Sequence, residues 1–385
     1  MPEPVRLSLD DRQLLVELQS LGVRVEDATD GPLPGRLGGA GPSDALFLWV
    51  RGLPLTVPSH ASYVDASPYT VRVEGKRATL FRDDELVGPV TLPPRPRIYD
   101  MQTADGVPYW KIALLHLDSI ASTVVQKCIY WDTPEQCGFC GIELTRGEQT
   151  IPVKTPAQLA EVCTAARDYD HAVDVTLTTG SLNRRDRGAI YISRCASAIK
   201  EASGLPIQVQ FEPPDDLRVL DEVARAGVDA VGIHSETFDP EVLARVAPGK
   251  AQCGIEGYFR TWERAVDVFG RGSVTTYVLL GMGEREELII EGCRRAIAMG
   301  VYPFVVPLRP VPGTLMADSP TPDPDYVGRV YGEVAAMLSE AGFDHLDAKA
   351  GCARCQACSG LSAWERVMRR EDGADLDDLF VGAHG

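Results

Sequence analysis

The sequence predicts an α/β fold with an open, partial (β/α)6 TIM-type barrel at its centre. Two helical segments between apolar runs have clear starts, because Thr155-Pro156 and Asp239-Pro240 each supply a capping residue followed by a first-turn proline. Alternating strands and helices indicate a parallel sheet with right-handed crossovers. A closed barrel has eight strands, and only six apolar runs occur here, so we expect an open one. The six runs are 119–126, 173–178, 206–211, 228–233, 273–280 and 302–307.

The segments on either side of the barrel follow different patterns. Residues 9–21 have apolar residues on one face and predict a helix. Short alternating runs separated by turn residues follow, and they predict a β-meander that ends at a proline-rich linker. We therefore expect an N-terminal α+β module over 1–100, the barrel over 101–342, and a cysteine-rich C-terminal extension with an acidic tail over 343–385.

Charge and hydropathy exclude some classes of function. The 385 residues include 55 acidic and 38 basic ones, a formal net charge of -17, and no lysine or arginine block occurs. This field would repel DNA and RNA, so we expect no nucleic-acid partner. No apolar run reaches the length of a membrane span, and the first residues do not resemble a signal peptide. We expect a cytoplasmic protein without a membrane partner.

The cysteines indicate metal binding. Six of the ten fall into two groups of three, and clusters of this kind in a cytoplasmic chain favour metal over disulfides. The other four are scattered and are expected to be small buried side chains. The first group is Cys128-x8-Cys137-x2-Cys140, and the second is Cys352-x2-Cys355-x2-Cys358; the scattered ones are Cys163, Cys195, Cys253 and Cys293.

The first group follows the first strand of the predicted barrel. Three thiolates are one fewer than a closed structural zinc site takes. They can hold three irons of a [4Fe–4S] cluster and leave the fourth iron open, a departure from the usual ligation by four cysteines. An open iron can chelate the amino and carboxylate groups of S-adenosylmethionine (SAM), and an electron from the cluster can then break the sulfonium C–S bond, a reaction that needs a cofactor.

At this point the sequence resembles the radical SAM superfamily. Gly138-Phe139-Cys140 is similar to the end of its cysteine motif, and the resemblance implies that Phe139 lies near the adenine of SAM. The gap between Cys128 and Cys137 is eight residues, where the commonest form has three. Cys128 is therefore the ligand that the motif supports least.

Polar residues and glycines follow the other predicted strands, at the barrel end where catalytic residues gather. The resemblance implies SAM contacts for the residues after strands two, three and five, and we expect catalytic roles for the remainder. Each residue alone has a structural explanation, such as a core histidine, a helix cap or a surface ion pair; the joint pattern is the stronger signal. The SAM-binding candidates are Thr178, Thr179, Gly180, Glu212, Gly281 and Gly283; the catalytic candidates are Gln210, His234, Glu236 and Arg309.

A narrower resemblance extends over about residues 100–360. Stretches such as EPPDDL (212–217), VGIHSETFDP (231–240) and YPFVVPLRPVPGT (302–314) resemble a little-characterised radical SAM family found in bacterial gene clusters that also carry a nitrilase-like enzyme. Gly281-x-Gly283-Glu284 and the end of the sixth strand are similar to the biotin and lipoyl synthase branch. This resemblance does not fix the reaction.

The second cysteine group has the spacing of the first three ligands of a bacterial ferredoxin run, without a fourth cysteine. We interpret it as the site of a second [4Fe–4S] cluster. Its fourth iron would be bound by a distant cysteine, by Ser359 or His345, by substrate, or by nothing. The alternative is a four-cysteine zinc site that combines Cys137-x2-Cys140 with Cys355-x2-Cys358.

These observations predict a radical SAM enzyme that takes a hydrogen atom from a small-molecule substrate, with an electron supplied by flavodoxin or ferredoxin. The second cluster would serve sulfur insertion or substrate ligation. One alternative is oxidation, rearrangement or carbon–carbon bond formation with the second cluster as an electron relay. An alternative of another class is a non-catalytic iron–sulfur or zinc scaffold protein. An ordinary metal-dependent hydrolase is disfavoured because the six histidines do not cluster.

Overall fold

The computed structural model describes residues 9–27, 45–75, 77–144 and 149–371; the acidic tail predicted at the C-terminus falls almost entirely outside these ranges. Its main sheet has seven strands in the order β13-β12-β11-β10-β9-β8-β7. Strands β8 to β13 are parallel, and β7 pairs antiparallel with β8. The strands are β7 (Leu114–His116), β8 (Ser119–Thr123), β9 (Asp174–Thr178), β10 (Ile207–Gln210), β11 (Ala230–Gly232), β12 (Val274–Leu280) and β13 (Val301–Pro307).

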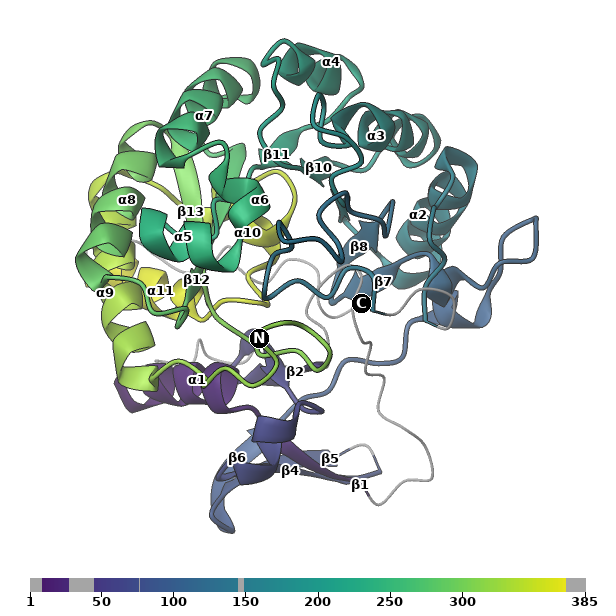
Figure 1. The fold of residues 1–385 in the computed structure, drawn as a ribbon. Helices are drawn as coiled ribbons and strands as arrows, with labels where there is room; N and C mark the ends of the chain where they lie inside the picture. The colour runs from purple at the N-terminus through teal and green to yellow at the C-terminus, as the bar shows by residue number, and fades with distance from the viewer. Residues whose placement is uncertain (1–8, 28–44, 76, 145–148, 372–385) are drawn as a thin grey trace.

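Helices cover the outer face of this sheet. Figure 1 shows α2, α3, α4, α7, α8 and α9 in an arc around the curled strands, which leave the barrel open on one side. The prediction of an α/β fold with an open barrel is confirmed, whereas β7 was not predicted. The helices of the barrel are α2 (Pro156–Asp170), α3 (Ala189–Ser203), α4 (Val219–Arg225), α5 (Pro240–Val246), α6 (Pro248–Ala251), α7 (Ile255–Phe269), α8 (Glu286–Ala298) and α9 (Pro324–Glu340).

The two predicted helix starts are confirmed. The Thr155 side chain accepts a hydrogen bond from the Gln158 amide, and the Gln158 side chain accepts one from the Thr155 amide, which is a complete capping box before α2. Asp239 accepts from the amides of Glu241 and Val242 at the start of α5. Such caps typically contribute about 1 kcal/mol each.

The sheet has an apolar outer face and a polar inner face. Val175, Leu177 and Val209 are fully buried in the main hydrophobic core. The alternate positions carry polar groups that are also buried, such as Thr176, Gln208 and Gln210. Buried polar side chains are costly unless they find partners, and here Gln210 donates to Gln208, which in turn donates to Thr275.

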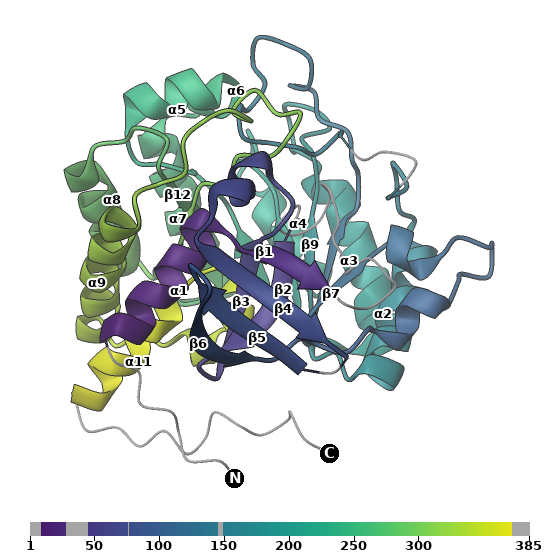
Figure 2. The same ribbon diagram turned by 90° about the horizontal axis from the view of Figure 1, so that it is seen from below.

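The N-terminal module lies across the open side of the barrel, between β7 and α9 (Figures 1 and 2). It contains a four-stranded sheet in the order β1-β4-β5-β6, a separate β2–β3 hairpin, and α1, which packs against α9 and β3. The predicted helix over 9–21 and the predicted meander are present. Its elements are α1 (Leu9–Leu21), β1 (Arg24–Asp27), β2 (Ala45–Val50), β3 (Leu53–Pro58), β4 (Tyr69–Glu74), β5 (Arg77–Arg82) and β6 (Glu85–Val90).

The C-terminal extension contains α10 (Cys352–Cys355) and α11 (Leu361–Glu371). The turn that carries the second cysteine group, here called the base turn (residues 351–360), lies under the N-terminal ends of the strands. The Gly351 amide donates to the carboxylate of Asp174, the first residue of β9, over 2.6 Å. Arg354 forms an ion pair with Asp118, in the turn before β8. The base turn therefore closes the end of the barrel opposite to the carboxyl ends of the strands.

Candidate active site

The first cysteine group lies on a loop at the carboxyl end of β8, here called the mouth loop (residues 124–144). The loop is bound to the end of β9, because the Gly180 amide donates to the Val125 carbonyl over 3.0 Å and the Ile129 amide donates to the Ser181 carbonyl over 2.8 Å. A Cβ atom at Gly180 would lie 2.0 Å from the carbonyl oxygen of Lys127. Glycine at position 180 therefore allows the mouth loop to lie against the strand end.

The other side of the mouth loop packs near β12. The Gly138 amide donates to the Val246 carbonyl over 2.7 Å, and the Met316 amide donates to the Gly138 carbonyl over 3.0 Å. Phe139 and Cys137 pack in a small apolar cluster with Met282. This cluster places the aromatic side chain next to the turn that follows β12.

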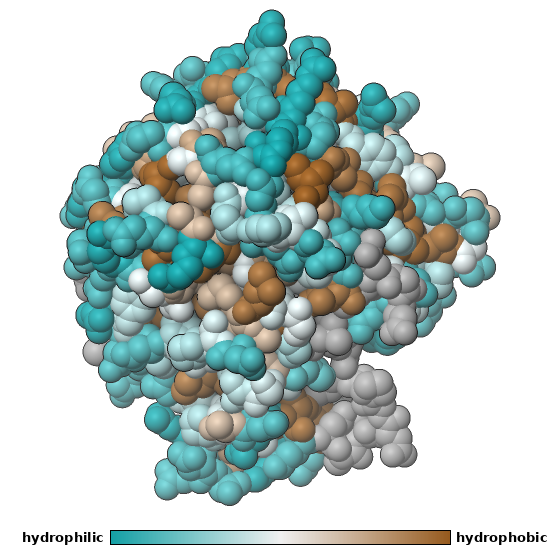
Figure 3. Space-filling model, viewed as in Figure 1, coloured by the Kyte–Doolittle hydropathy of each residue, from teal (hydrophilic) through white to brown (hydrophobic). Residues whose placement is uncertain are grey.

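An open groove of about 560 Å³ lies between the mouth loop and that turn, and its lining includes Gly138, Gly281 and Gly283. Gly281 and Gly283 have φ values of 100° and 88°, so the turn needs glycine at both positions. The Glu284 carboxylate accepts from the amides of Gly281 and Met282 at 2.7 Å each and holds the turn in place. Figure 3 shows apolar residues near the middle of this face, among polar ones.

Burial raises the pKa values of the three mouth-loop thiols. The pKa of Cys140 rises to about 11, with the neighbouring Cys128 adding to the effect of burial, and Cys140 in turn raises the pKa of Cys137. The Cys140 amide donates to the Cys137 carbonyl over 3.2 Å, so these two cysteines share one turn of the loop. The Lys250 ammonium lowers the pKa of each of the three thiols and so partly offsets the burial. Three thiols on one loop with a cation nearby suit a cluster that their thiolates would make negative.

Lys250 was not identified from the sequence. Its ammonium donates to the His234 carbonyl over 3.2 Å and forms an ion pair with the Glu236 carboxylate. Burial alone would lower the pKa of Lys250, but Glu236 together with Tyr258, Cys137 and Glu212 outweighs this effect and raises the pKa, so the side chain stays charged. Glu236 has a φ of 67°, an unusual conformation for glutamate. The predicted residue Glu236 therefore holds a cation beneath the first cysteine group.

Glu212 lies in a second polar network beneath the mouth loop. Its carboxylate accepts from the Ser181 hydroxyl over 2.8 Å and from the Tyr130 hydroxyl over 3.3 Å. Arg187 donates to the same Tyr130 hydroxyl over 2.5 Å and stands 3.6 Å from Asp215. The network ties the carboxylate to the mouth loop and to the residues after β9.

His234 and Gln210 lie in the barrel lumen, where a Cβ atom at Gly232 would touch both. The His234 ring contacts the Tyr277 ring edge-on at 4.7 Å, and its Nδ1 accepts from the Tyr277 amide over 3.0 Å. Burial, with Lys250 adding to it, lowers the pKa of His234 well below its usual value, so the ring is neutral and its proton sits on Nε2. The buried Nε2 has no hydrogen-bond partner among the described residues. It is a buried donor that the described residues leave unsatisfied.

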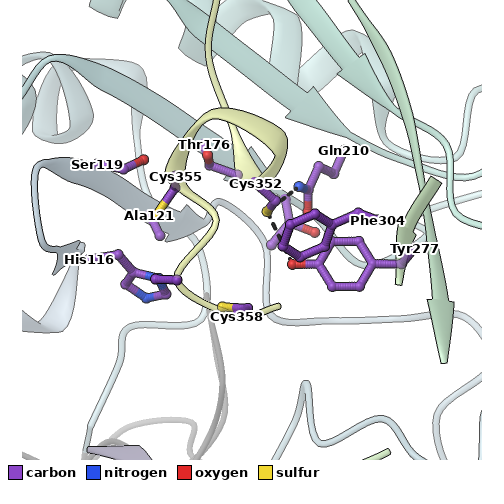
Figure 4. A pocket seen from close by; sticks show the side chains of 12 residues that line it. His116, Ser119, Ala121, Thr176, Gln210, Tyr277, Phe304, Cys352, Cys355 and Cys358 are labelled. Atoms are coloured by element: carbon purple, nitrogen blue, oxygen red, sulfur yellow. Dashed lines mark hydrogen bonds between the residues drawn. The ribbon is translucent and has the colours of Figure 1, made fainter. Parts of the chain in front are cut away.

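The lumen continues to the second cysteine group. The Tyr277 hydroxyl lies 3.1 Å from the Cys352 sulfur and Gln210 Nε2 lies 3.4 Å from it. Burial raises the pKa of Cys352 to about 12, with Cys358 adding to the effect. Figure 4 shows the three thiols around a cavity of about 60 Å³ that also borders β7, β8 and β9.

Arg309 follows the carboxyl end of β13 and contacts the N-terminal hairpin. Its guanidinium donates to the Thr56 carbonyl over 2.7 Å and lowers the pKa of Cys358, which burial raises. Its buried NH1 group has no hydrogen-bond partner among the described residues. The predicted residue therefore belongs with the second cysteine group, and the N-terminal hairpin holds it there.

Within the described ranges, no three His, Cys, Asp or Glu side chains converge on a point that would hold one metal ion. The ligands of a zinc ion all lie about 2.0–2.3 Å from it, so the four-cysteine zinc site is not formed in this structure. The ligands of a [4Fe–4S] cluster each bind a different iron and do not need to converge. The donor sets of the mouth loop and the base turn fit such clusters.

The structure divides the predicted residues between three regions. Those near the mouth loop are Phe139, Thr179, Gly180, Glu212, Glu236, Gly281 and Gly283; Gln210 and His234 lie in the lumen, where Thr178 also lines the cavity of the second cysteine group, and Arg309 lies after β13 beside Cys358. Sequence reasoning missed Lys250 and Tyr277. A lysine directly after Pro248-Gly249, and a tyrosine inside an apolar strand, were the signals available.

Residues 134–292 match the model of the Radical SAM superfamily. A 135-residue part of the chain is 30% identical to the bacteriochlorophyllide c C-7(1)-hydroxylase of Chlorobaculum limnaeum. The matched region covers 34% of this chain and 33% of the relative's length. Among the described residues, no helix has the length and apolar character of a membrane span.

Similar solved structures include methylornithine synthase, at 18% identity and a TM-score of 0.46, over 68% of this chain and 72% of that one. A radical SAM methyltransferase from Sphaerobacter thermophilus is 15% identical with a TM-score of 0.45, over 72% of this chain and 76% of that one.

Proposed function

Because this chain contains a radical SAM superfamily domain, we propose that it is an enzyme that cleaves SAM reductively and takes a hydrogen atom from a small molecule in its barrel. One observation carries the proposal. A chain of polar contacts joins the two cysteine groups: Lys250, which lowers the pKa of the mouth-loop thiols, donates to the His234 carbonyl, and Gln210 on the neighbouring strand reaches the Cys352 sulfur.

The mouth loop is proposed to hold the SAM-binding cluster through Cys128, Cys137 and Cys140. When bound, this cluster and SAM supply a 5′-deoxyadenosyl radical that can break an unactivated C–H bond. We propose that the adenosine part of SAM lies in the groove lined by Gly138, Gly281 and Gly283, whose volume of about 560 Å³ is in the range of small-molecule sites. The narrow lumen and the mouth loop exclude water, which protects a reactive intermediate from side reactions.

The substrate is proposed to lie in the lumen below the mouth loop. The Nε2–H group of His234 is a hydrogen-bond donor without a protein partner, and an oxygen of the substrate can accept from it. The Gln210 amide reaches the Cys352 sulfur and can also turn toward a ligand. We propose that these two side chains orient the substrate, while the Lys250–Glu236 pair maintains the charge balance beneath the mouth loop.

The base turn is proposed to hold a second [4Fe–4S] cluster through Cys352, Cys355 and Cys358. An oxidative outcome, in which this cluster accepts an electron after hydrogen abstraction, is favoured by the likeness to a hydroxylase. Sulfur insertion or substrate ligation is the second candidate, and the observation that favours it is the shared cavity, since the base thiols border the same lumen as Gln210 and Tyr277.

The electron donor is proposed to be a flavodoxin or ferredoxin. No role for nucleic acid is proposed, since the net charge is -17. A non-catalytic iron–sulfur scaffold is the alternative from another class. It predicts that the fully reduced protein forms no 5′-deoxyadenosine from SAM.

Iron and acid-labile sulfide per chain test the proposal, measured after anaerobic reconstitution of the wild type and of a variant in which Cys352, Cys355 and Cys358 are alanine. Two clusters predict about eight irons falling to about four. About four irons in both proteins would refute the second cluster. Formation of 5′-deoxyadenosine by the reduced wild type tests the first cluster separately, and its absence would favour the scaffold alternative.

A further inference from the structure

We infer that His116 is the fourth ligand of the cluster at the base turn, beside Cys352, Cys355 and Cys358. The inference rests on the proposed second cluster and assigns its remaining iron. It draws on the position of His116 at the cavity and on two independent contacts that hold it there.

His116 is the last residue of β7, the antiparallel strand that extends the sheet past β8. Its side chain is buried and lines the same cavity as the three base-turn cysteines. Figure 4 shows the imidazole on the side of the cavity between Cys355 and Cys358. Cys352 lies on another side of the cavity, near Tyr277. Four donor side chains thus surround one space.

An ion pair fixes the base turn to the end of β7. The Arg354 guanidinium binds both carboxylate oxygens of Asp118, at 2.6 and 3.2 Å. Arg354 is adjacent to Cys355, and Asp118 is two residues after His116. The pair therefore ties the base turn to the turn that directly follows His116. Asp174 accepts from the same guanidinium over 3.2 Å and adds a third point of attachment.

One cross-strand residue pair of the β2–β3 hairpin contacts both His116 and Cys358. Phe47 and Thr56 are directly paired in this hairpin, so their side chains point to the same face. The Phe47 ring packs against the His116 ring at 4.7 Å between centroids, and the Thr56 hydroxyl lies 3.9 Å from the Cys358 sulfur. The N-terminal module thus holds the imidazole and this thiol side by side.

The candidates named from the sequence have other partners. The Ser359 hydroxyl donates to the Val305 carbonyl over 2.6 Å. His345 Nδ1 lies 2.6 Å from the carboxylate of Glu365, and Glu365 also accepts from the Tyr302 hydroxyl over 2.8 Å. Neither residue lines the cavity. None of the four scattered cysteines lines it either: Cys163, Cys195, Cys253 and Cys293.

The chemistry of the donor set favours the imidazole. Thiolate and imidazole are good ligands for iron, whereas hydroxyl and amide groups such as those of Ser119 and Gln210 suit harder cations. Histidine in place of cysteine also raises the reduction potential of an iron–sulfur cluster, as in Rieske centres. A cluster with three cysteines and one histidine would accept an electron more readily, which suits the oxidative outcome proposed above. It would leave no open iron for substrate.

The test uses the reconstituted full-length protein without SAM, reduced anaerobically, with histidine labelled by ¹⁵N in the imidazole ring. Pulsed EPR of the labelled wild type is expected to show a strongly coupled nitrogen that changes with the isotope. The variant His116→Cys is expected to lose this coupling, to keep about eight irons, and to show a lower reduction potential for the second cluster. The control His171→Asn, at the exposed end of α2 with a φ of 55°, should retain the coupling.

Wild type with about eight irons but without a histidine nitrogen coupling would overturn the inference and leave the second cluster standing. Coupling that persists in His116→Cys would also overturn it. About four irons in the wild type would instead refute the second cluster, and the inference with it. The labelled wild type needs no substitution, so the test stands even if His116→Cys fails to fold.

Discussion

The mouth loop and the base turn each present three cysteines, yet their surroundings differ. The mouth loop borders an open groove of about 560 Å³, and the Lys250 ammonium lowers the pKa of its thiols. The base turn is enclosed between the strand starts and the N-terminal hairpin, with Arg309 at Cys358. An open site suits a cofactor that exchanges in every turnover, whereas an enclosed site suits a resident group. The same donor set can therefore serve two tasks in one barrel.

The largest expected effect is on SAM cleavage, which should be lost when a mouth-loop cysteine is replaced and kept when a base-turn cysteine is replaced. Cys140→Ala should abolish formation of 5′-deoxyadenosine, because it removes a ligand of the cluster that binds SAM. Cys355→Ala should leave reductive SAM cleavage largely intact and lose the product of the full reaction. Both are measured by chromatography after anaerobic reduction. Wild-type cleavage by Cys140→Ala, or loss of cleavage by Cys355→Ala with the first cluster retained, would contradict this division.

Gly180→Ala should damage only the mouth loop. The added Cβ would lie 2.0 Å from the Lys127 carbonyl oxygen, so the loop must move away from β9. Overpacking of this kind costs about 1–3 kcal/mol, and we expect loss of most of the first cluster with the second retained. Iron content and EPR spectra measure this. Gly332→Ala is the control, since its Cβ would lie at an ordinary 3.6 Å from Trp364; equal losses in the two variants would argue against a local effect.

Asp174→Asn should loosen the base turn. The buried carboxylate accepts from the Gly351 amide and pairs with Arg354, and the substitution removes its charge at nearly constant volume. Loss of a hydrogen bond to a charged group costs about 1.5–3 kcal/mol, measured by urea unfolding. The second cluster should be lost more readily than the first. Asp168→Asn, which breaks an exposed pair with Arg167, should change neither property; a selective loss of the first cluster in Asp174→Asn would contradict the placement.

The smallest expected effect is a shift in reduction potential when Lys250 or Arg309, the cation near each cysteine group, is replaced. The double variant Lys250→Gln, Glu236→Gln removes a buried ion pair whose cation is the closer member to the mouth-loop thiols, and it should lower the reduction potential of the first cluster only. Arg309→Gln should lower that of the second cluster only, because it removes the cation beside Cys358. Redox titrations followed by EPR measure both shifts. Equal shifts of both clusters in either variant would contradict the assignment of one cation to each site.

Local patterns in the sequence predicted the elements of the fold. The capping residue Thr155 and the apolar runs each act within one helix or strand, so a short segment of sequence is enough to predict them. The additional strand β7 was not predicted, because three residues are too few to show a period of two.

Part of the candidate site was also predicted from the sequence, because some of its residues occupy positions that a local pattern fixes. Strand-end residues such as Gly180 and His234 follow from the rule that barrels place function at the carboxyl ends. The roles of Lys250, His116 and Arg309 depend on contacts between distant segments. The contact between Thr56 and the base turn, for example, joins residues about three hundred positions apart, and no local pattern encodes it.

The base turn also bears on the order of assembly. The Thr56 amide donates to the Ala357 carbonyl over 2.6 Å, so the β2–β3 hairpin is joined to the base turn directly beside the second cysteine group. Contacts between residues so far apart in the chain carry a high closure entropy and form late. We therefore expect the surroundings of the second cysteine group to be completed only when the N-terminal module docks, whereas the mouth loop is held by contacts within the barrel itself.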